Sequence, residues 1–382
     1  VVLATGGHTR LWRRSSSRRD ENVGDGMALS LDAGAALADM ELVQFHPTGM
    51  VAPETVAGTL VTEAVRGEGG YLLNALGERY MAKYDAERME LSTRDRVALA
   101  NYTEIIEGRG GPNGGVFLDI SHRSKEDILL KLPRMYRQFL EYQMLDISTT
   151  PMEVAPTAHY SMGGVVVTPE THATSVIGLY AAGEVTSGLH GANRLGGNSL
   201  AETVVFGRRA GEAAAAFSNN LTTQQRSPAA IKAANEALDA QIKNGSQMAR
   251  PLQRAVRDVM WENGGVVRSG DRISAGLEKL MAIREASAAL DVRPSAEGWQ
   301  DLALAFDLRA ALMSAEATLR GALERRESRG AHQRTDYPDT DAALAVNFLI
   351  RLDDTGQQVI HSMPVPPLSE ACLLYTSDAA DE

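Results

Sequence analysis

The sequence predicts an α/β fold that is interrupted by a second region and followed by a bundle of helices. Buried-strand runs that end in glycine turns occur at residues 1–7 (VVLATGG) and 178–184 (GLYAAGE), and an apolar helical run follows at 200–215. Between residues 42 and 156 the pattern changes to short strands with many glycines. After residue 229, apolar residues recur at helical spacing in three separate stretches. These three observations are typical of an α/β layer, an inserted α+β region and a three-helix domain.

Composition limits the possible functions. The chain has 382 residues, of which 44% are hydrophobic and 23% charged, which leaves room for two or three globular domains. A formal net charge of -11 argues against a nucleic-acid partner. A single cysteine excludes an internal disulfide framework or a cysteine-based metal cluster. No apolar run in the sequence is as long as a membrane span.

The order of elements follows from periodicity. We expect a strand at 1–7, a polar, basic loop at 8–22, a packed helix at 26–37, a helical stretch at 124–145 and a linker at 218–228. The apolar stripes of the three expected bundle helices are Leu252, Val256, Val259 and Met260; Ile273, Leu277, Leu280 and Met281; and Leu304, Leu308, Leu312, Ala315, Leu319 and Leu323.

These patterns predict the domain limits. Residues 1–41 and 157–217 form the α/β domain, 42–156 the inserted domain, 229–342 the helical domain and 343–371 a C-terminal extension. The opening residues read as the middle of a sheet, so we expect the N-terminal part of a larger protein to be missing. Residues 372–382 (CLLYTSDAADE) look like a translated sequencing adapter, and we expect them to be a non-native tail.

Two motifs of the inserted region carry candidate chemistry. In QFHPTG (44–49), a proline follows His46, which favours an extended or turn conformation and lets the imidazole be aimed. A structural histidine is the alternative. In LVTEAVRGEGG (60–70), Thr62 offers a hydroxyl, and Glu63 and Arg66 face each other on a helical turn. The alternative for this segment is a helix salt bridge that ends in a glycine cap.

Three further motifs contain candidate polar residues. STRDR (92–96) contains Arg94, which in isolation is most simply part of a solvated charge cluster. PTAHYSMGG (156–164) contains His159 beside small residues. HGANRLGGNSL (190–200) combines His190 and Arg194 with small residues and a hydroxyl, just beyond an expected strand end, where α/β proteins bind ligands.

Together these residues indicate an anionic substrate. His46, Thr62, His159 and Arg194 could all donate hydrogen bonds to carboxylate oxygens, and a dicarboxylate needs such donors at both ends. A carboxylate flanked by arginines, as Glu63 would be, suggests a proton relay more than a metal site. No His, Cys and Asp cluster has metal-ligand spacing. The motifs G-x-S-x-G, G-x-G-x-x-G and G-x-x-x-x-G-K-[ST] are all absent.

A series of motifs gives the chain a specific resemblance. It resembles the flavoprotein subunit of succinate dehydrogenase and fumarate reductase, a family that also includes L-aspartate oxidase. The resemblance covers residues 1 to about 370 and implies a partial FAD-binding Rossmann-like domain, interrupted by an α+β capping domain and followed by a helical domain. The motifs occur in this order: GDGMALSLDAGAAL, QFHPTG, LVTEAVRGEGGYL, STRD, EGRG, PTAHYSMGG, GLYAAGEV, LHGANRLGGNSL and RRESRGAHQRTDYP.

The resemblance implies a role for each motif residue. Arg94 would be the general acid/base that exchanges a proton with the substrate carbon while flavin N5 exchanges the hydride, and Glu63 and Arg66 would pass protons to it. Four residues would hold the substrate carboxylates: His46, Thr62, His159 and Arg194. Four positions match FAD contacts: Asp25, Glu184, Ser199 and Leu200.

Partners and location also follow only from the resemblance. It implies a separate iron–sulfur subunit, membrane-anchor subunits, and a cytoplasmic location, peripheral on the inner face of the cell membrane through those partners. Because the family's G-x-G-x-x-G is absent, we expect the chain as given to hold FAD poorly and to be inactive. L-aspartate oxidase and a non-catalytic subunit that keeps the fold are the alternatives. NRLGGNSL and RGAH favour the succinate/fumarate branch over the oxidase, and the presence of every expected substrate residue argues against a non-catalytic subunit.

Overall fold

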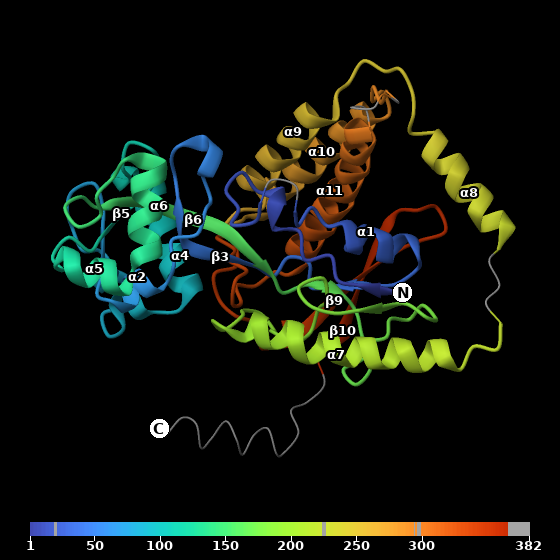
Figure 1. Ribbon diagram of the computed structural model, residues 1–382, viewed down its shortest axis with the longest axis horizontal. Coiled ribbons are helices and arrows are strands. Elements are labelled where there is room, and N and C mark those ends of the chain that lie inside the picture. The colour runs from blue at the N-terminus through green and yellow to red at the C-terminus, as the bar shows by residue number, and fades with distance from the viewer. Residues whose placement is uncertain (19–20, 224–226, 294, 296–298, 366–382) are drawn as a thin grey trace.

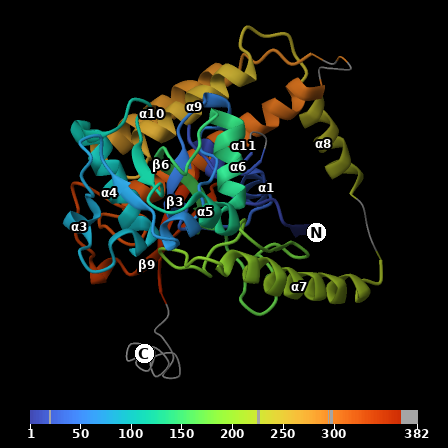
Figure 2. The same cartoon turned by 60° about the vertical axis from the view of Figure 1, so that its left-hand side comes forward.

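The computed structural model describes residues 1–18, 21–223, 227–293, 295 and 299–365. The expected non-native tail, 372–382, lies outside the described residues. A lobe that contains α4, α5 and α6 occupies one end of the molecule, and the helices α9, α10 and α11 stand together above the centre (Figure 1). α7 runs along the lower edge in both views (Figure 1 and Figure 2). The expected combination of α/β layers, an inserted α+β region and a helical bundle is therefore present.

The α/β layers are built from short strands. β1 (Val2–Leu3) pairs in parallel with β8 (Tyr180–Ala181). A second sheet has the order β10–β9–β2–β7, in which β2 (Leu37–Ala38) pairs with β7 (Gly164–Val165) and with β9 (Val346–Leu352). β9 and β10 (Gln358–Pro364) form an antiparallel hairpin, so the C-terminal extension completes a sheet that begins near the N-terminus.

The helix expected at 26–37 is shorter than the sequence suggested. α1 spans Asp25–Asp32 and ends in a left-handed residue, Gly34 (φ 89°). The Gly34 N–H bonds to the Leu31 carbonyl (3.0 Å) and the Ala35 N–H to the Ser30 carbonyl (2.8 Å), which is the Schellman pattern of a helix end. The helix therefore ends before residue 37, and the chain continues as β2.

The inserted lobe is built on an antiparallel sheet with the order β3–β6–β5–β4. Its strands are β3 (Val43–Met50), β4 (Tyr71–Leu73), β5 (Val116–Asp119) and β6 (Met152–Ser161). The helices of the lobe are α2 (Ala64–Gly67), α3 (Met81–Tyr84), α4 (Arg94–Glu104), α5 (Lys125–Lys131) and α6 (Pro133–Gln143). The helical stretch expected at 124–145 is present but divided into α5 and α6, because Pro133 has no N–H and Leu132 leaves helical geometry (φ -125°, ψ 38°) before the second helix starts.

The C-terminal bundle confirms the helical spacing read from the sequence. It consists of α9 (Ala249–Asn263), α10 (Gly270–Ser287) and α11 (Trp299–Glu324), which share one apolar core. Of the expected stripe residues, Met281 is the exception, since it is 55% exposed. α7 (Asn198–Asn219) and α8 (Pro228–Asp239) lie outside this bundle, and α8 stands apart in both views (Figure 1 and Figure 2).

The expected polar loop at 8–22 is anchored in the bundle core. Leu11 and Trp12 are buried in the apolar core of the bundle, and the Trp12 indole N–H bonds to the Gly264 carbonyl (3.0 Å). The sequence predicted a polar loop here because basic residues surround Leu11 and Trp12. The loop therefore joins the bundle to the edge of β6, where Ser15 bridges Ala158.

Candidate active site

Two imidazoles meet where β3 and β6 pair. β3 carries His46 and β6 carries His159, and the register places His46 opposite Thr157. The ring centroids lie 5.3 Å apart, with the ring planes 72° to each other. The Thr48 N–H donates to His46 Nδ1 (3.2 Å), and Ser16 Oγ lies 2.8 Å from His159 Nδ1. Strand pairing thus brings together two residues that lie far apart in the sequence.

Both histidines are neutral at neutral pH. Burial is the largest cause that holds the pKa of His46 well below its usual range, and the nearby His159, Arg94 and Arg66 add to the effect. Burial, followed by the charges of Arg194 and Arg94, lowers the pKa of His159 to about 3. The rings can therefore donate or accept hydrogen bonds without carrying charge, and the positive charge of the site comes from arginines.

One amide connects the two arginines of the site. Gln44 Oε1 accepts from Arg94 Nη1 (3.3 Å) and from Arg194 Nη2 (3.2 Å). Its Nε2 donates to the Arg194 carbonyl and to Asn193 Oδ1, each at 2.7 Å. Gln44 is fully buried on β3, two residues before His46. The strand thus holds the start of α4 and the loop at 190–197 in one arrangement.

A line of alternating charges leads away from Arg94. Glu63 Oε2 accepts from Arg94 Nε (2.9 Å) and lies 2.8 Å from Arg94 Nη2. The other oxygen, Oε1, lies 3.9 Å from Arg66 Nη2. The Arg66 side chain is fully buried, whereas that of Glu63 is 49% exposed. Burial lowers the pKa of Arg66, Glu63 opposes this effect, and the charge of Arg94 adds to it.

Both interpretations of the segment at 60–70 hold in part. The ion pair between Glu63 and Arg66 exists, and α2 does end in a left-handed glycine, Gly69 (φ 96°). The shorter pair, however, joins Glu63 to Arg94. The Arg94 side chain is only 16% exposed, so the simple interpretation of it as a solvated charge is wrong, while the Arg96 side chain is 64% exposed. The Thr62 hydroxyl forms no hydrogen bond with the described part of the chain.

Arg194 rests on an aromatic ring that the sequence analysis did not single out. Its guanidinium carbon lies 4.2 Å from the centroid of the Tyr160 ring, and Nη1 donates to Ser199 Oγ (3.1 Å). Arg194 Nε is buried and has no hydrogen-bond partner in residues 1–365 as far as they are described. The Tyr160 hydroxyl donates to Glu202, which also lies 3.0 Å from His190 Nε2.

Three site residues were therefore missed: Gln44, Tyr160 and Glu202. Strand periodicity could have identified Gln44, since positions 44 and 46 of a strand face the same side. Tyr160 directly follows His159 in a motif already noted. Glu202 lies on the first turns of α7, one helical turn after Asn198. Gln44 and Tyr160 are uncharged, so a search for charged residues does not find them. Glu202 is acidic, but it stands among mainly apolar helix residues and outside every motif noted above.

The four expected cofactor positions lie on three elements. Asp25 is the first residue of α1, and burial raises its pKa. Glu184 follows β8 and accepts from the Ser161 N–H (3.0 Å) and from Asn22 Nδ2 (3.3 Å), yet burial still raises its pKa to about 7. Ser199 and Leu200 lie in the first turn of α7, and Leu200 is 75% exposed. The Ser199 hydroxyl accepts a hydrogen bond from Arg194 Nη1 (3.1 Å). Within the described residues, Asp25 forms no hydrogen bond with Glu184, Ser199 or Leu200.

No metal site accompanies this arrangement in the described residues. Across these ranges, no group of three or more His, Cys, Asp or Glu side chains is placed to hold a metal ion. Each helix in the same ranges is also too short or too polar to span a bilayer.

Two family models match the chain. A model described as FAD binding domain matches residues 1–200, and a model described as fumarate reductase flavoprotein C-term matches residues 253–366. The chain belongs to the succinate dehydrogenase and fumarate reductase flavoprotein family. The resemblance read from the motifs is confirmed, and FAD is confirmed as the cofactor of this domain.

Named relatives agree with this assignment. The chain is 46% identical to one of the subunits of the fumarate reductase (CoM/CoB) of Methanothermobacter marburgensis, over 89% of this chain and 61% of the relative. It is 39% identical to the 8-methylmenaquinol:fumarate reductase flavoprotein subunit of Wolinella succinogenes, over 94% and 59%. Among solved structures, the FrdA chain of E. coli quinol fumarate reductase matches with a TM-score of 0.89 and 33% identity, over 97% of this chain and 67% of that chain.

The extent of these matches sets a limit. The chain spans about three fifths of the length of the curated relatives. The likeness to the E. coli chain confirms the fold class, namely mixed sheets and helices with a C-terminal helical domain. A further match, with a TM-score of 0.74 and 20% identity to an adenylylsulfate reductase of Archaeoglobus fulgidus, supports the fold alone.

Proposed function

We propose that the protein from which this chain comes interconverts succinate and fumarate as an FAD-dependent oxidoreductase. The observation that carries the proposal is the pair of arginines joined through Gln44. Arg194 and the two neutral imidazoles would bind the carboxylates of a short diacid, and Gln44 holds a second cation, Arg94, beside them for proton transfer. The family of the chain and the names of its relatives support the same substrate class.

Substrate binding is assigned to four side chains. Arg194 offers the strongest donor, because its guanidinium is a permanent cation with a planar set of N–H groups that suits a carboxylate. His46 and His159 contribute neutral donors, which avoids a large excess of positive charge once the diacid is released. The free hydroxyl of Thr62, next to Glu63, completes the set. Together these groups would bind both carboxylates and orient the carbon–carbon bond between them.

Proton transfer is assigned to Arg94. Its guanidinium would exchange a proton with the substrate carbon, and Glu63, in direct contact at 2.8 Å, would receive or return that proton. Arg66 extends the line from Glu63 into the interior, where burial disfavours its charged form. Because the Glu63 side chain is 49% exposed, the relay has access to water.

The residues around Glu184 suit the cofactor. When bound, FAD supplies the acceptor or donor of hydride. The buried carboxyl of Glu184 could accept a hydroxyl hydrogen bond, and backbone approach is close there, since a Cβ on Gly7 would lie 2.6 Å from Glu184 Oε1. Ser199 could offer its backbone N–H from the start of α7, and Asp25 could do so at the start of α1, whereas the Leu200 N–H already donates to the Gly197 carbonyl (3.2 Å).

The test is Arg94→Ala in the full-length, FAD-loaded protein. We expect turnover of succinate with an artificial electron acceptor to fall by about two to four orders of magnitude, because a positioned acid/base is lost. Binding of malonate should largely survive, since Arg194 and the imidazoles remain. Arg96→Ala is the matched control, because this neighbouring arginine is exposed and its ion pair is the 3.6 Å contact with Asp85. Unchanged turnover in Arg94→Ala would remove Arg94 from the mechanism, and absence of turnover in the loaded wild type would favour the non-catalytic alternative.

The same full-length, FAD-loaded preparation tests the identity of the substrate. Oxidation of aspartate with formation of peroxide, together with no response to succinate, would redirect the assignment to L-aspartate oxidase. We further propose that electrons pass to an iron–sulfur subunit, and that membrane-anchor subunits hold the complex at the inner face of the cell membrane. Co-purification of the full-length protein with an iron–sulfur chain from membranes tests this part.

A further inference from the structure

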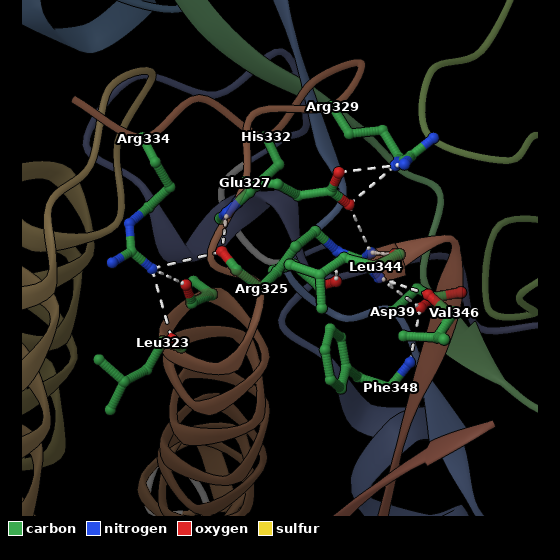
Figure 3. Close-up of polar contacts among 12 residues, drawn as sticks. Asp39, Leu323, Arg325, Glu327, Arg329, His332, Arg334, Leu344, Val346 and Phe348 are labelled. Carbon is green, nitrogen blue, oxygen red and sulfur yellow. Dashed lines mark hydrogen bonds and ion pairs between the residues drawn. The ribbon is translucent and has the colours of Figure 1, made fainter. Parts of the chain in front are cut away.

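A buried network of charges follows the last residue of α11. The guanidinium of Arg325, whose side chain is 2% exposed, donates to Glu41 Oε1 (2.7 Å), Asp39 Oδ1 (3.1 Å) and Glu327 Oε1 (3.2 Å). It also donates to the carbonyls of Leu344 and Val346 (Figure 3). A buried carboxylate or guanidinium without a partner of opposite charge is costly. The contacts between Arg325 and the three carboxylates therefore hold these segments of the chain together.

A tight turn follows this network at residues 329–332. Arg329 and His332 exchange backbone hydrogen bonds of 2.9 and 3.0 Å, and Gly330 at the corner has a left-handed φ of 54°. His332 is fully buried in this turn. Arg268 Nη1 donates to His332 Nδ1 (2.8 Å), so Nε2 carries the hydrogen that is donated to the Arg325 carbonyl (3.2 Å). The imidazole therefore ties the turn to the network (Figure 3).

The tip of the turn lies directly against the loop that carries Arg194. The Ala331 N–H donates to the Ala192 carbonyl (2.9 Å), and a Cβ on Gly330 would lie 2.3 Å from the same oxygen. Ala331 also packs with Tyr160, the ring beneath the Arg194 guanidinium. The turn thus contacts both the backbone and the aromatic support of Arg194.

The same network also holds the start of β3. Arg268 Nη1 donates to the Glu41 carbonyl (2.8 Å), and Arg325 binds the Glu41 side chain. Glu41 lies three residues before Gln44, the amide that accepts from both site arginines. One rigid cluster from the helical domain therefore contacts the two segments, β3 and the loop at 190–197, that meet in the site.

We propose that the turn at 329–332 is a positioning element for dicarboxylate recognition. It holds the loop that places the Arg194 guanidinium within hydrogen-bond distance of Gln44 Oε1 (3.2 Å), and so couples the helical domain to substrate affinity. This inference rests on the proposed function only for the identity of the ligand. The positioning itself is a property of the Ala192, Tyr160 and Gly330 contacts.

The test is Gly330→Ala in the full-length, FAD-loaded protein, with Gly356→Ala as the matched control. Both glycines have positive φ, but a Cβ on Gly356 would meet nothing within 4 Å, so the control reports the backbone strain alone. We expect Gly330→Ala to raise the KM for succinate and the Kd for malonate by about ten- to hundredfold, while kcat changes much less, because the displaced group binds substrate. A merely structural role would lower the amount of folded enzyme and leave KM unchanged.

A second measurement and a second variant keep the inference testable if Gly330→Ala fails to fold. Hydrogen exchange of the peptide that contains residues 190–197 should be faster in Ala331→Gly, which removes the methyl group packed on Tyr160, and unchanged in Gly356→Ala. This readout needs no substrate. If the wild type neither binds nor turns over dicarboxylates but exchange still responds, the proposed function fails and the positioning stands. If exchange and malonate affinity are both unchanged in the variants, the positioning element is refuted.

Discussion

Gln44 offers the most direct test of how the site is held together, through the substitution Gln44→Met. Methionine has nearly the same length but removes four hydrogen bonds, two from guanidinium groups at 3.2 and 3.3 Å and two made by the amide nitrogen at 2.7 Å. The guanidinium bonds are long, and Arg94 can turn to water. We therefore expect a loss of about 3 kcal/mol in the free energy of unfolding. This value treats all four hydrogen bonds as ordinary neutral ones and gives no extra weight to the two with guanidinium groups.

Substrate affinity should fall as well, because Arg94 and Arg194 lose their common anchor. We expect the Kd for malonate, measured by the change in flavin absorbance of the full-length protein, to rise about tenfold or more. Gln44→Glu is the companion variant. It keeps an acceptor for both arginines but adds a negative charge where the diacid must bind, which at roughly 5 Å and an effective dielectric constant near 20 costs about 3 kcal/mol per unit charge.

Both variants should lose stability in urea unfolding, because neither side chain can donate to the Arg194 carbonyl and Asn193 Oδ1 as the amide nitrogen does. Gln44→Glu should lose more affinity than Gln44→Met. If Gln44→Met binds malonate within about twofold of the wild type and unfolds at the same urea concentration, then the amide does not organise the site. In that case the arginines are held by their other contacts, which for Arg94 is Glu63 and for Arg194 is Tyr160.

Three further outcomes follow from the geometry. Burial raises the pKa of Glu184 from 4.5 to about 7, so the folded chain keeps a proton that the unfolded chain releases in this window and loses stability as the pH rises through it; urea unfolding at several pH values should show a flatter dependence in Glu184→Gln. Tyr160→Leu should weaken malonate binding about three- to thirtyfold through loss of the ring under Arg194, whereas Tyr160→Phe should bind nearly as the wild type. Arg325→Met should lower the free energy of unfolding by about 3–5 kcal/mol in thermal or urea denaturation, because it leaves buried carboxylates without their cation. A tolerated Arg325→Met, a pH profile unchanged in Glu184→Gln, or equal affinities for the two Tyr160 variants would contradict the respective reasoning.

The helical parts of the fold were predictable because their signals are local. Apolar residues three and four apart identified the bundle helices, and single residues decide the exceptions: Pro133 divides one expected helix, and Gly34 ends another early. Met281 lies on the predicted stripe of α10 but at its edge, where the neighbouring helices do not cover it. Periodicity predicts which face of a helix is apolar. How many residues of that face are buried depends on the neighbouring helices, which the sequence pattern does not show.

The site was predictable only in part, because residue types that often bind ligands, such as histidine and arginine, stand out in a sequence, whereas the residues that connect them do not. His46 and His159 stood out through their residue type and local sequence. Gln44 and Tyr160 are common types in strands, and their importance arises only when β3, β6 and the loop at 190–197 meet. Likewise, the motif RRESRGAHQRTDYP was noted as a family signature, but its contact with Ala192 depends on the packing of the helical domain.

The neutrality of the two buried imidazoles has a physiological consequence. Since the pKa of His159 lies at about 3 and that of His46 well below its usual range, neither ring changes protonation when the acidity of a cell drifts. An anion that approaches these two histidines therefore meets the same uncharged rings during acid stress as at rest. Any sensitivity of the proposed activity to acidification would have to originate elsewhere, for example in Glu184 and Asp25, whose pKa values burial raises, or in the ionisation of the diacid itself.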